Sequence, residues 1–473
     1  MQDVTGCRLG KNESGIHWGR YITDGLVVFL FVFVVFEISV NVVWATDHAT
    51  SLTQLDYALF TNHTVSLGKA SSTPPWTVDD FHYGGQNYSA LAPGTAFLAL
   101  PFMAVGFSLA GSYTAYGPVL FWAGTFVSIM GAVASYFVYK IAGLYFRRAT
   151  SLLLGLGFGL STISWPFATY FFQSDVSAML VLASVYFALK AERADGSAAI
   201  TALACGLAAG LAFTVDYVDA IVVPILFAFL VIKKSDSMVS SVKAAGAFAM
   251  GVLPSLVAIG AYNFAIFGNP FMTTESAYVG QSVFGKFSTP LLYGLALNFS
   301  SLSRGVFAFA PLAFLGVVGY VVSLRRGVKG DTLLWLTIFL GIVIPYSAWY
   351  DPSGGLSFGP RFLVPAIPFL ILPAGYVVER ARGLGIWVVY ALFAAGSVIN
   401  GMAAFVTAVP PSTAFYVSPF LSYVLPNFGA GNFDSVWAIY LGHSWLVGAT
   451  LVVSLGVVAP LAWVEAVRRR AER

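Results

Sequence analysis

The distribution of basic residues constrains this chain more than any other feature of its sequence. One threading through a membrane places all but four of its 24 Lys and Arg residues on one side. Lys69, Lys286, Arg304 and Arg361 remain on the other side, together with most of the polar motifs. Because Lys and Arg concentrate in cytoplasmic loops, this threading predicts that the polar motifs face away from the cytoplasm.

The composition also requires a membrane. Of the 473 residues, 58% are hydrophobic and 10% are charged, with a mean hydropathy of +0.80. A soluble chain of this length carries about 25% charged residues. Apolar runs near the ~20 residues that cross a bilayer recur along the chain. We therefore predict an all-α polytopic plasma-membrane protein with about 12 transmembrane helices and both termini in the cytoplasm.

The predicted domain organisation is simple. Residues 1–23 form a cytoplasmic segment and residues 24–473 form a single transmembrane domain. Its long outer loops are 46–114, 268–303 and 408–442. The apolar stretch 93–110 would reverse the side of every later basic cluster if it crossed the bilayer. We expect it to lie in the outer interface as an interfacial segment, where Pro93 and Pro101 favour an interrupted helix.

Several function classes are disfavoured. The basic residues are sorted by side and form no patch for a nucleic acid. Cys7 and Cys205 do not suggest a disulfide framework, and no Cys/His cluster has zinc spacing. The inner loops are too short for a catalytic domain, so chemistry is expected at the outer surface. We predict no cofactor and no metal site. A divalent cation bound by Asp79 and Asp80 is the alternative.

The first outer loop holds the richest polar motifs. Asp47 follows the first apolar run, and residues 78–89 (VDDFHYGGQNYS) contain Asp79 and Asp80. Carboxylates at such a boundary can accept a proton from a hydroxyl, although an isolated Asp more often caps a helix. The candidates for contact with a substrate are His48, His82, Tyr83 and Tyr88, and each histidine taken alone is typical of a surface residue.

Three later segments add candidates. Glu275 follows residues 262–271 (YNFAIFGNPF), and Arg304 lies in residues 299–311 (FSSLSRGVFAFAP). Asp351 and Arg361 lie in residues 349–361 (WYDPSGGLSFGPR), where Gly and Pro predict tight turns. A guanidinium offers a planar fork that matches phosphate oxygens. The ordinary alternative is that Arg361 pairs with Asp351 or binds lipid headgroups.

In this order, the motifs resemble the GT-C superfamily of membrane glycosyltransferases, in particular the prokaryotic branch similar to the glycosyltransferase-39 and protein O-mannosyltransferase families. The resemblance spans about residues 20 to 380. It is carried by Asp47 and by residues 79–94 (DDFHYGGQNYSALAPG), 97–101 (FLALP), 262–271, 303–311 (SRGVFAFAP) and 354–361 (GGLSFGPR).

The resemblance implies a polyprenyl-phosphate sugar donor and inverting transfer to a hydroxyl of a glycan, lipid or protein acceptor on the extracytoplasmic face. An acidic residue early in the first outer loop acts as the general base in such families, and Asp47 fits. The neighbouring His48 departs from the usual acidic or Arg neighbour, so Asp56, Asp79 and Asp80 remain rivals. Arg361 and Arg304 are the best matches to a cation near the donor phosphate.

A secondary transporter or a lipid-linked sugar flippase is the main alternative. Twelve helices with both ends inside is also a common transporter plan. Transporters usually place ionisable groups near the midplane and often contain related halves. Here Glu37 is the one intramembrane carboxylate, and no repeat is visible, so the outer polar motifs favour the enzyme.

Overall fold

Helices make up nearly all the regular structure in the computed structural model, which describes residues 14–43, 46–69, 77–110, 116–193, 198–234, 237–279, 283–325 and 330–456. The first part contains α1 (Ser14–Ile38), α2 (Asp47–Asn62), β1 (Gly68–Lys69), β2 (Asp80–Tyr83), β3 (Gln86–Ser89), α3 (Gly94–Ala110), α4 (Tyr116–Ala142), α5 (Arg148–Leu160), α6 (Ser164–Phe167), α7 (Ser174–Arg193), α8 (Ala198–Val215), η1 (Tyr217–Ile221), α9 (Val222–Lys233) and α10 (Met238–Phe267).

The second part has shorter elements between its long helices. It contains α11 (Thr274–Val279), η2 (Val283–Lys286), α12 (Leu291–Ser300), α13 (Val306–Phe309), η3 (Pro311–Ala313), α14 (Phe314–Arg325), α15 (Gly330–Ala348), η4 (Arg361–Leu363), α16 (Pro368–Val378), α17 (Leu384–Val406), η5 (Ser412–Tyr416), η6 (Phe420–Val424), α18 (Leu425–Gly429), α19 (Val436–Ile439) and α20 (Trp445–Gly456).

The apolar helices agree with the predicted all-α polytopic membrane fold. In the described ranges, α4, α7, α8, α10, α15 and α17 are long and apolar enough to cross a bilayer. Six further apolar stretches of 10–17 residues are helical, among them α3, α5 and α16. Because these six helices are shorter than the spanning ones, the number of about 12 transmembrane helices stays a prediction.

The basic clusters gather at one end of the bundle. Arg148 Nε lies 2.5 Å from Asp24 Oδ2, which joins the start of α5 to α1. Asp331, at the start of α15, lies 3.1 Å from Arg193 of α7 and 3.2 Å from Lys233 of α9. Arg193 and Lys233, from two basic loops that are predicted to be cytoplasmic, therefore meet at one carboxylate, as one-sided threading requires.

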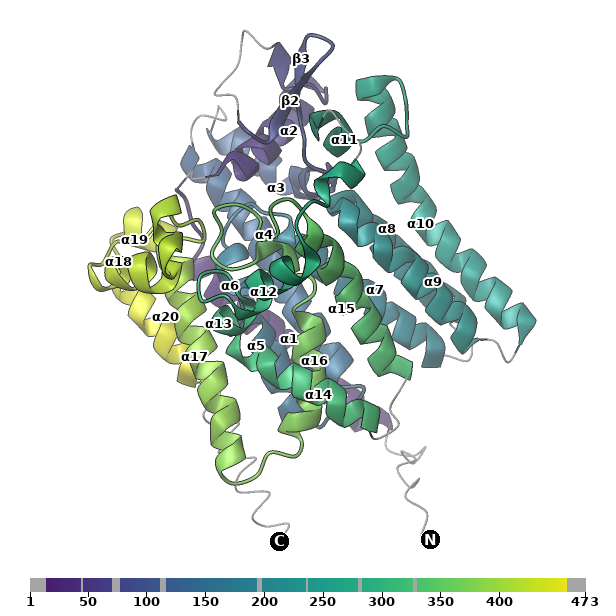
Figure 1. Ribbon diagram of the computed structural model, residues 1–473, viewed down its shortest axis with the longest axis vertical. Helices are drawn as coiled ribbons and strands as arrows, with labels where there is room; N and C mark the ends of the chain where they lie inside the picture. The colour runs from purple at the N-terminus through teal and green to yellow at the C-terminus, as the bar shows by residue number, and fades with distance from the viewer. Residues whose placement is uncertain are drawn as a thin grey trace.

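The opposite end carries α2, α11 and a small sheet (Figure 1). The sheet has the order β1-β3-β2 and is antiparallel throughout. Gly84 and Gly85 form its turn with φ values of 55° and 80°, as a tight hairpin requires. Phe81 stacks on Phe267 with ring centroids 6.0 Å apart, so the hairpin is seated on the end of α10.

Both ends of α3 lie at this same end of the bundle. Its first residue, Gly94, presses on the end of α8, since a Cβ at Gly94 would lie 2.3 Å from Thr214 Oγ1. Its later residue Gly106 lies against the start of α4, where a Cβ would be 3.2 Å from the Cα of Val119. Helix α3 thus does not run from one end of the bundle to the other. That it lies in the membrane interface stays a proposal.

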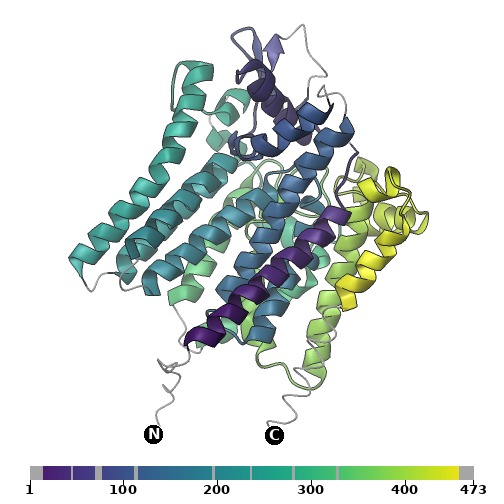
Figure 2. The same ribbon diagram turned by 180° about the vertical axis from the view of Figure 1, so that it is seen from behind.

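The outer edges of the bundle differ in exposure. Within the most apolar window of each helix, 78% of α7 is buried but only 33% of α10. Figures 1 and 2 show α10 at one edge of the bundle, with α18, α19 and α20 at the opposite edge. An apolar helix that is exposed along most of its length faces lipid when it crosses a membrane.

Candidate active site

Three segments that are far apart in sequence meet around the ring of Phe172. His48, in the first turn of α2, packs against this ring in a tilted arrangement with centroids 5.1 Å apart. The Arg361 guanidinium lies 5.0 Å from the centre of the same ring. Asp79, which precedes β2, completes the group with its Oδ2 3.6 Å from His48 Nδ1. The structure therefore brings together candidates from the first outer loop and from the 349–361 segment.

Arg361 is the least satisfied charged group in this cluster. Within the described part of the chain, its guanidinium has no hydrogen bond or ion pair, and its Nε is buried without a partner. Aromatic rings hold it instead, because Phe362 lies 5.2 Å away in addition to Phe172. The side chain as a whole is partly buried. A rigid guanidinium with open donors is suited to receive an anion.

The loop that carries Arg361 is fixed by its own polar groups. Asp351 accepts hydrogen bonds from the backbone N–H of Gly355 at 2.7 Å and from Ser353 Oγ at 2.9 Å. Asp351 is thus occupied within the loop, and the described residues show no ion pair between it and Arg361, which was the ordinary alternative to a phosphate-binding role. Gly354 adopts φ 80° and lies against the Arg361 side chain, where a Cβ would be 2.8 Å from Cγ. The predicted tight glycine turns are confirmed.

Arg304 anchors this loop from outside. Its Nη1 donates to Ser353 Oγ at 2.8 Å and also to the Gly355 carbonyl. Its guanidinium stacks on Phe415 at 4.0 Å from the ring centre. Arg304 is therefore engaged, and Arg361 is the more available of the two predicted phosphate-binding residues.

Charge in the cluster is set by burial and by Arg361. Burial would raise the pKa of Asp79, but the His48 contact and the nearby Arg361 charge lower it below its usual value. Burial lowers the pKa of His48, although Asp79 opposes the shift. His48 is then mainly neutral at pH 7, and its contact with Asp79, assisted by the charge of Arg361, keeps Asp79 ionised. The expectation that His48 is a surface residue is wrong, because only 5% of it is exposed.

The four rival carboxylates have different surroundings. Asp80 accepts from Ser51 Oγ at 2.6 Å, and burial raises its pKa to about 6. Asp56 is fully buried in α2, and neither of its carboxylate oxygens has a partner. Asp47, by contrast, is exposed in the first turn of α2, and no described residue bonds to its carboxylate. Asp47 and Asp79 are the two that can meet a substrate.

Beneath the cluster lie residues that the motifs did not identify. Asp216 caps η1 by accepting from the Val218 N–H at 3.0 Å. Its Oδ2 also accepts from Tyr346 Oη and, at 3.4 Å, from Gln173 Nε2. Gln173 and Tyr346 carry no sequence signal, since their roles depend on tertiary packing.

A rim of aromatic and charged residues borders the cluster. The Tyr278 hydroxyl donates to the carbonyl of Val78 at 2.7 Å, next to Asp79. Lys286 Nζ lies 3.9 Å from the centre of the Tyr350 ring. Burial raises the pKa of Glu275 to about 7, against the positive charge of Lys286 and together with the negative charges of Asp216 and Asp79. Glu275 therefore belongs electrostatically to the same site.

Three further candidates lie in the hairpin and have other contacts. Tyr83 packs edge-on against Phe267 at 5.0 Å, and Tyr88 packs against Phe81 at 5.9 Å. His82 is exposed, with its Nδ1 3.4 Å from Asn87 Oδ1. None of these three contacts reaches His48 or Arg361. A role for His82, Tyr83 and Tyr88 at the substrate remains a prediction.

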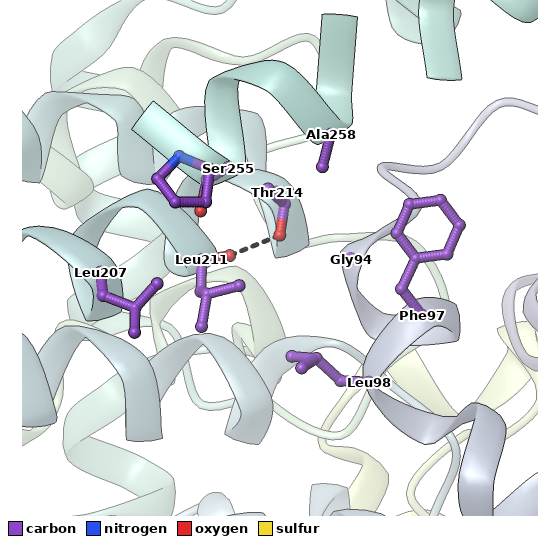
Figure 3. A pocket seen from close by; sticks show the side chains of 9 residues that line it. Gly94, Phe97, Leu98, Leu207, Leu211, Thr214, Ser255 and Ala258 are labelled. Carbon is purple, nitrogen blue, oxygen red and sulfur yellow. Dashed lines mark hydrogen bonds between the residues drawn. The ribbon is translucent and has the colours of Figure 1, made fainter. Parts of the chain in front are cut away.

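No three His, Cys, Asp or Glu side chains in the described ranges are arranged to hold a metal ion. An apolar cavity of about 240 Å³ does lie between α3, α8 and α10 (Figure 3). Leu98, Leu211, Thr214 and Ala258 are among its lining residues, and Thr214 is two residues before Asp216. This cavity offers hydrocarbon-sized space beside the polar site.

Comparisons with known proteins bear on the fold. A family model described as dolichyl-phosphate-mannose-protein mannosyltransferase matches residues 102–261. The crystal structure of ArnT from Cupriavidus metallidurans bound to undecaprenyl phosphate matches with a TM-score of 0.52 at 15% identity, covering 95% of this chain and 76% of that one. No curated protein sequence matches the chain.

Two other solved structures give weaker matches. The Archaeoglobus fulgidus oligosaccharyltransferase has a TM-score of 0.48 at 12% identity. The match covers 92% of this chain and 56% of the oligosaccharyltransferase chain. Arabinosyltransferase EmbB from Mycobacterium smegmatis has a TM-score of 0.47 at 11% identity. The match covers 97% of this chain and 43% of EmbB.

Proposed function

We propose that this chain, which has the GT-C fold, is a membrane glycosyltransferase that uses a polyprenyl-phosphate sugar donor. The observation that carries the proposal is the guanidinium of Arg361, which has no hydrogen-bond or ion-pair partner among the described residues and lies beside His48 and Asp79. The solved ArnT contains undecaprenyl phosphate, which supports a lipid-phosphate donor here. The acceptor hydroxyl belongs to a glycan, a lipid or a protein on the extracytoplasmic face.

Arg361 is proposed to bind the donor phosphate. When the bond between the sugar and the phosphate breaks, negative charge develops on the leaving phosphate oxygen. A fixed guanidinium in a poorly hydrated site stabilises that charge without reorganisation. Its open hydrogen-bond donors are available for this task because Asp351 is occupied within its own loop.

Asp47 is proposed as the general base. Its carboxylate is exposed and bonded to no described residue, so it can approach an acceptor hydroxyl. Asp79 is already engaged by His48, and its lowered pKa makes it a weaker base. We assign Asp79 the role of orienting His48 beside Arg361. Attack from the face opposite the phosphate inverts the anomeric centre.

The cavity in Figure 3 is proposed to hold part of the donor's hydrocarbon tail. A cavity of ~150 Å³ lined by apolar side chains binds benzene, so one of about 240 Å³ takes roughly two isoprene-sized units. Its lining residue Thr214 is close in the chain to Asp216, whose charge acts on Arg361.

The proposal is tested by transfer from a radiolabelled polyprenyl-phosphate sugar in membrane vesicles. Arg361→Gln should raise the donor KM roughly 10- to 100-fold, because a hydrogen bond to a charged group contributes about 1.5–3 kcal/mol. Arg382→Gln, an exposed arginine after α16, is the matched control and should leave transfer unchanged. Equal donor KM values in both variants would remove Arg361 from the site.

The base is tested in the same assay. Asp47→Asn should abolish turnover while donor binding persists, whereas Asp80→Asn should retain activity because its amide oxygen can still accept from Ser51. Activity that survives Asp47→Asn but not Asp79→Asn would move the base to Asp79. The product's anomeric configuration, read by NMR, tests inversion.

The transporter alternative has less support. Glu37 Oε1 accepts from Thr125 Oγ1 at 2.7 Å and so joins α1 to α4, as a structural residue would. Uptake or flipping of a lipid-linked sugar without transfer of the label would favour the transporter or flippase.

A further inference from the structure

The segment between α17 and α20, residues 407–444, carries almost no charge; we call it the lateral segment. It contains no Lys, Arg or Glu, and its single Asp, Asp434, is half-buried. A stretch of this length in water carries about 25% charged residues. The prediction of a plain outer loop at 408–442 does not explain this composition.

The exposed surface of the lateral segment is aromatic and aliphatic. The most exposed large side chains are Tyr416 (89%), Val417 (68%), Tyr440 (61%), Leu421 (56%) and Leu441 (51%). The surface continues onto α20, where Trp445 is 66% exposed and Val452 is 69% exposed. Figures 1 and 2 show α18 and α19 projecting sideways from the bundle, away from the hairpin.

Several polar side chains of the lateral segment are hydrogen-bonded within the segment itself. Asn427 Nδ2 donates to the Tyr423 carbonyl at 2.8 Å, and Asn432 Nδ2 donates to Asn427 Oδ1 at 2.9 Å. Ser422 Oγ donates to the Ser418 carbonyl at 2.7 Å. Because lipid-exposed irregular backbone does not occur within the hydrocarbon region, a segment of this kind that contacts lipid lies at the interface of the bilayer.

We propose that the lateral segment is embedded in the leaflet on the side of the candidate site, with membrane lipids as its partner. Tyr416, Tyr440 and Trp445 lie at headgroup level, where amphipathic rings are favoured, and the aliphatic side chains contact acyl chains. The absence of surface charge and the continuity with the apolar face of α20 favour lipid over water. This inference does not depend on the proposed reaction.

The lateral segment is attached to the loop that carries Arg361. The Phe358 N–H donates to the Ala408 carbonyl at 2.9 Å. Phe415 stacks on Arg304, which in turn bonds to Ser353 and Gly355. Lipid contact with the segment therefore helps to fix the position of that loop.

Spin-label accessibility in lipid nanodiscs tests the proposal. In a full-length variant with Cys7 and Cys205 replaced by Ala, nitroxides are attached at Tyr416→Cys and Leu441→Cys. Phe264→Cys, on the exposed face of α10, is the lipid-facing control, and His82→Cys in the hairpin is the water-facing control. We expect both test positions to collide several-fold more with oxygen than with a water-soluble nickel chelate, as Phe264→Cys does.

Two results would overturn the proposal that the lateral segment is embedded in lipid. Test positions that match His82→Cys would mean that the segment lies in water. Positions shielded from oxygen and nickel in native membranes, but open to them after purification, would mean that a protein partner covers the segment. Thermal unfolding of each labelled variant confirms that the fold is kept, since all four positions are exposed.

Discussion

At the scale of single residues, Arg361 differs from the other arginines whose contacts are described. Arg148 and Arg193 pair with carboxylates, and Arg304 bonds to its loop. Arg361 has aromatic rings on its faces but no bonded acceptor among the described residues. Aromatic faces attract a cation without using its N–H donors. The guanidinium is thereby held in place with its N–H donors open, as the proposed phosphate-binding role requires.

Glu275 should make donor binding depend on pH. Its pKa is raised by burial to about 7, so it is neutral below that pH and ionised above it. Ionisation adds negative charge beside Asp79 and Asp216 and repels the donor phosphate. The donor KM should therefore rise between pH 6 and pH 8, by roughly fivefold for a repulsion of about 1 kcal/mol. Steady-state kinetics across this range measure the effect.

The control for this prediction is Glu275→Gln, which keeps the shape and removes the titration. Its donor KM should stay low and nearly flat from pH 6 to pH 8. A slope as steep as that of the wild type would show that another group causes the pH dependence.

At the scale of elements, the contact between α3 and α8 depends on a glycine. A Cβ at Gly94 would lie 2.3 Å from Thr214 Oγ1 and 2.5 Å from its backbone carbonyl. Because backbone cannot rotate away, Gly94→Ala must displace α3 and should cost about 1–3 kcal/mol of stability. Thermal unfolding in detergent measures this. Gly246→Ala, at a helical glycine of α10 with open space around it, should be neutral or stabilising by up to ~1 kcal/mol.

The cavity between α3, α8 and α10 gives a prediction about donor length. Ala258→Trp fills it from the α10 side, whereas Val257→Trp adds the same group at a neighbouring position that does not line it and is 61% exposed. Ala258→Trp should raise the KM for a long polyprenyl donor but not for one with a single isoprene unit. Equal effects on both donors, or the same effect in Val257→Trp, would place the tail elsewhere.

At the scale of the whole molecule, charge sorting explains why the fold was largely predictable. The Lys and Arg clusters fixed the relative directions of the helices, and those directions bring Asp79, His48 and Arg361 to one end. Local properties such as the glycine turns of residues 354–359 were predictable too.

Burial and partner choice were not predictable in the same way. Nothing in the sequence shows that Phe172 separates His48 from Arg361, or that Gln173 and Tyr346 bond to Asp216, since these contacts join segments over 40 residues apart. The low charge of residues 408–442 was visible, but its meaning required the exposed fractions of Tyr416 and its neighbours.

The end of the bundle opposite the candidate site should be a rigid structural contact and not a gate. Asp331 accepts from Tyr145 Oη at 2.6 Å and lies within ion-pair distance of Arg193 and Lys233, so one carboxylate joins four segments. Asp331→Asn should cost about 1–3 kcal/mol, because it leaves two cations with a weaker partner. Thermal unfolding in detergent should show this loss, whereas the donor KM at the other end should not change. A variant of wild-type stability that gains passage of sugar through the membrane would instead indicate that these contacts close a transport path.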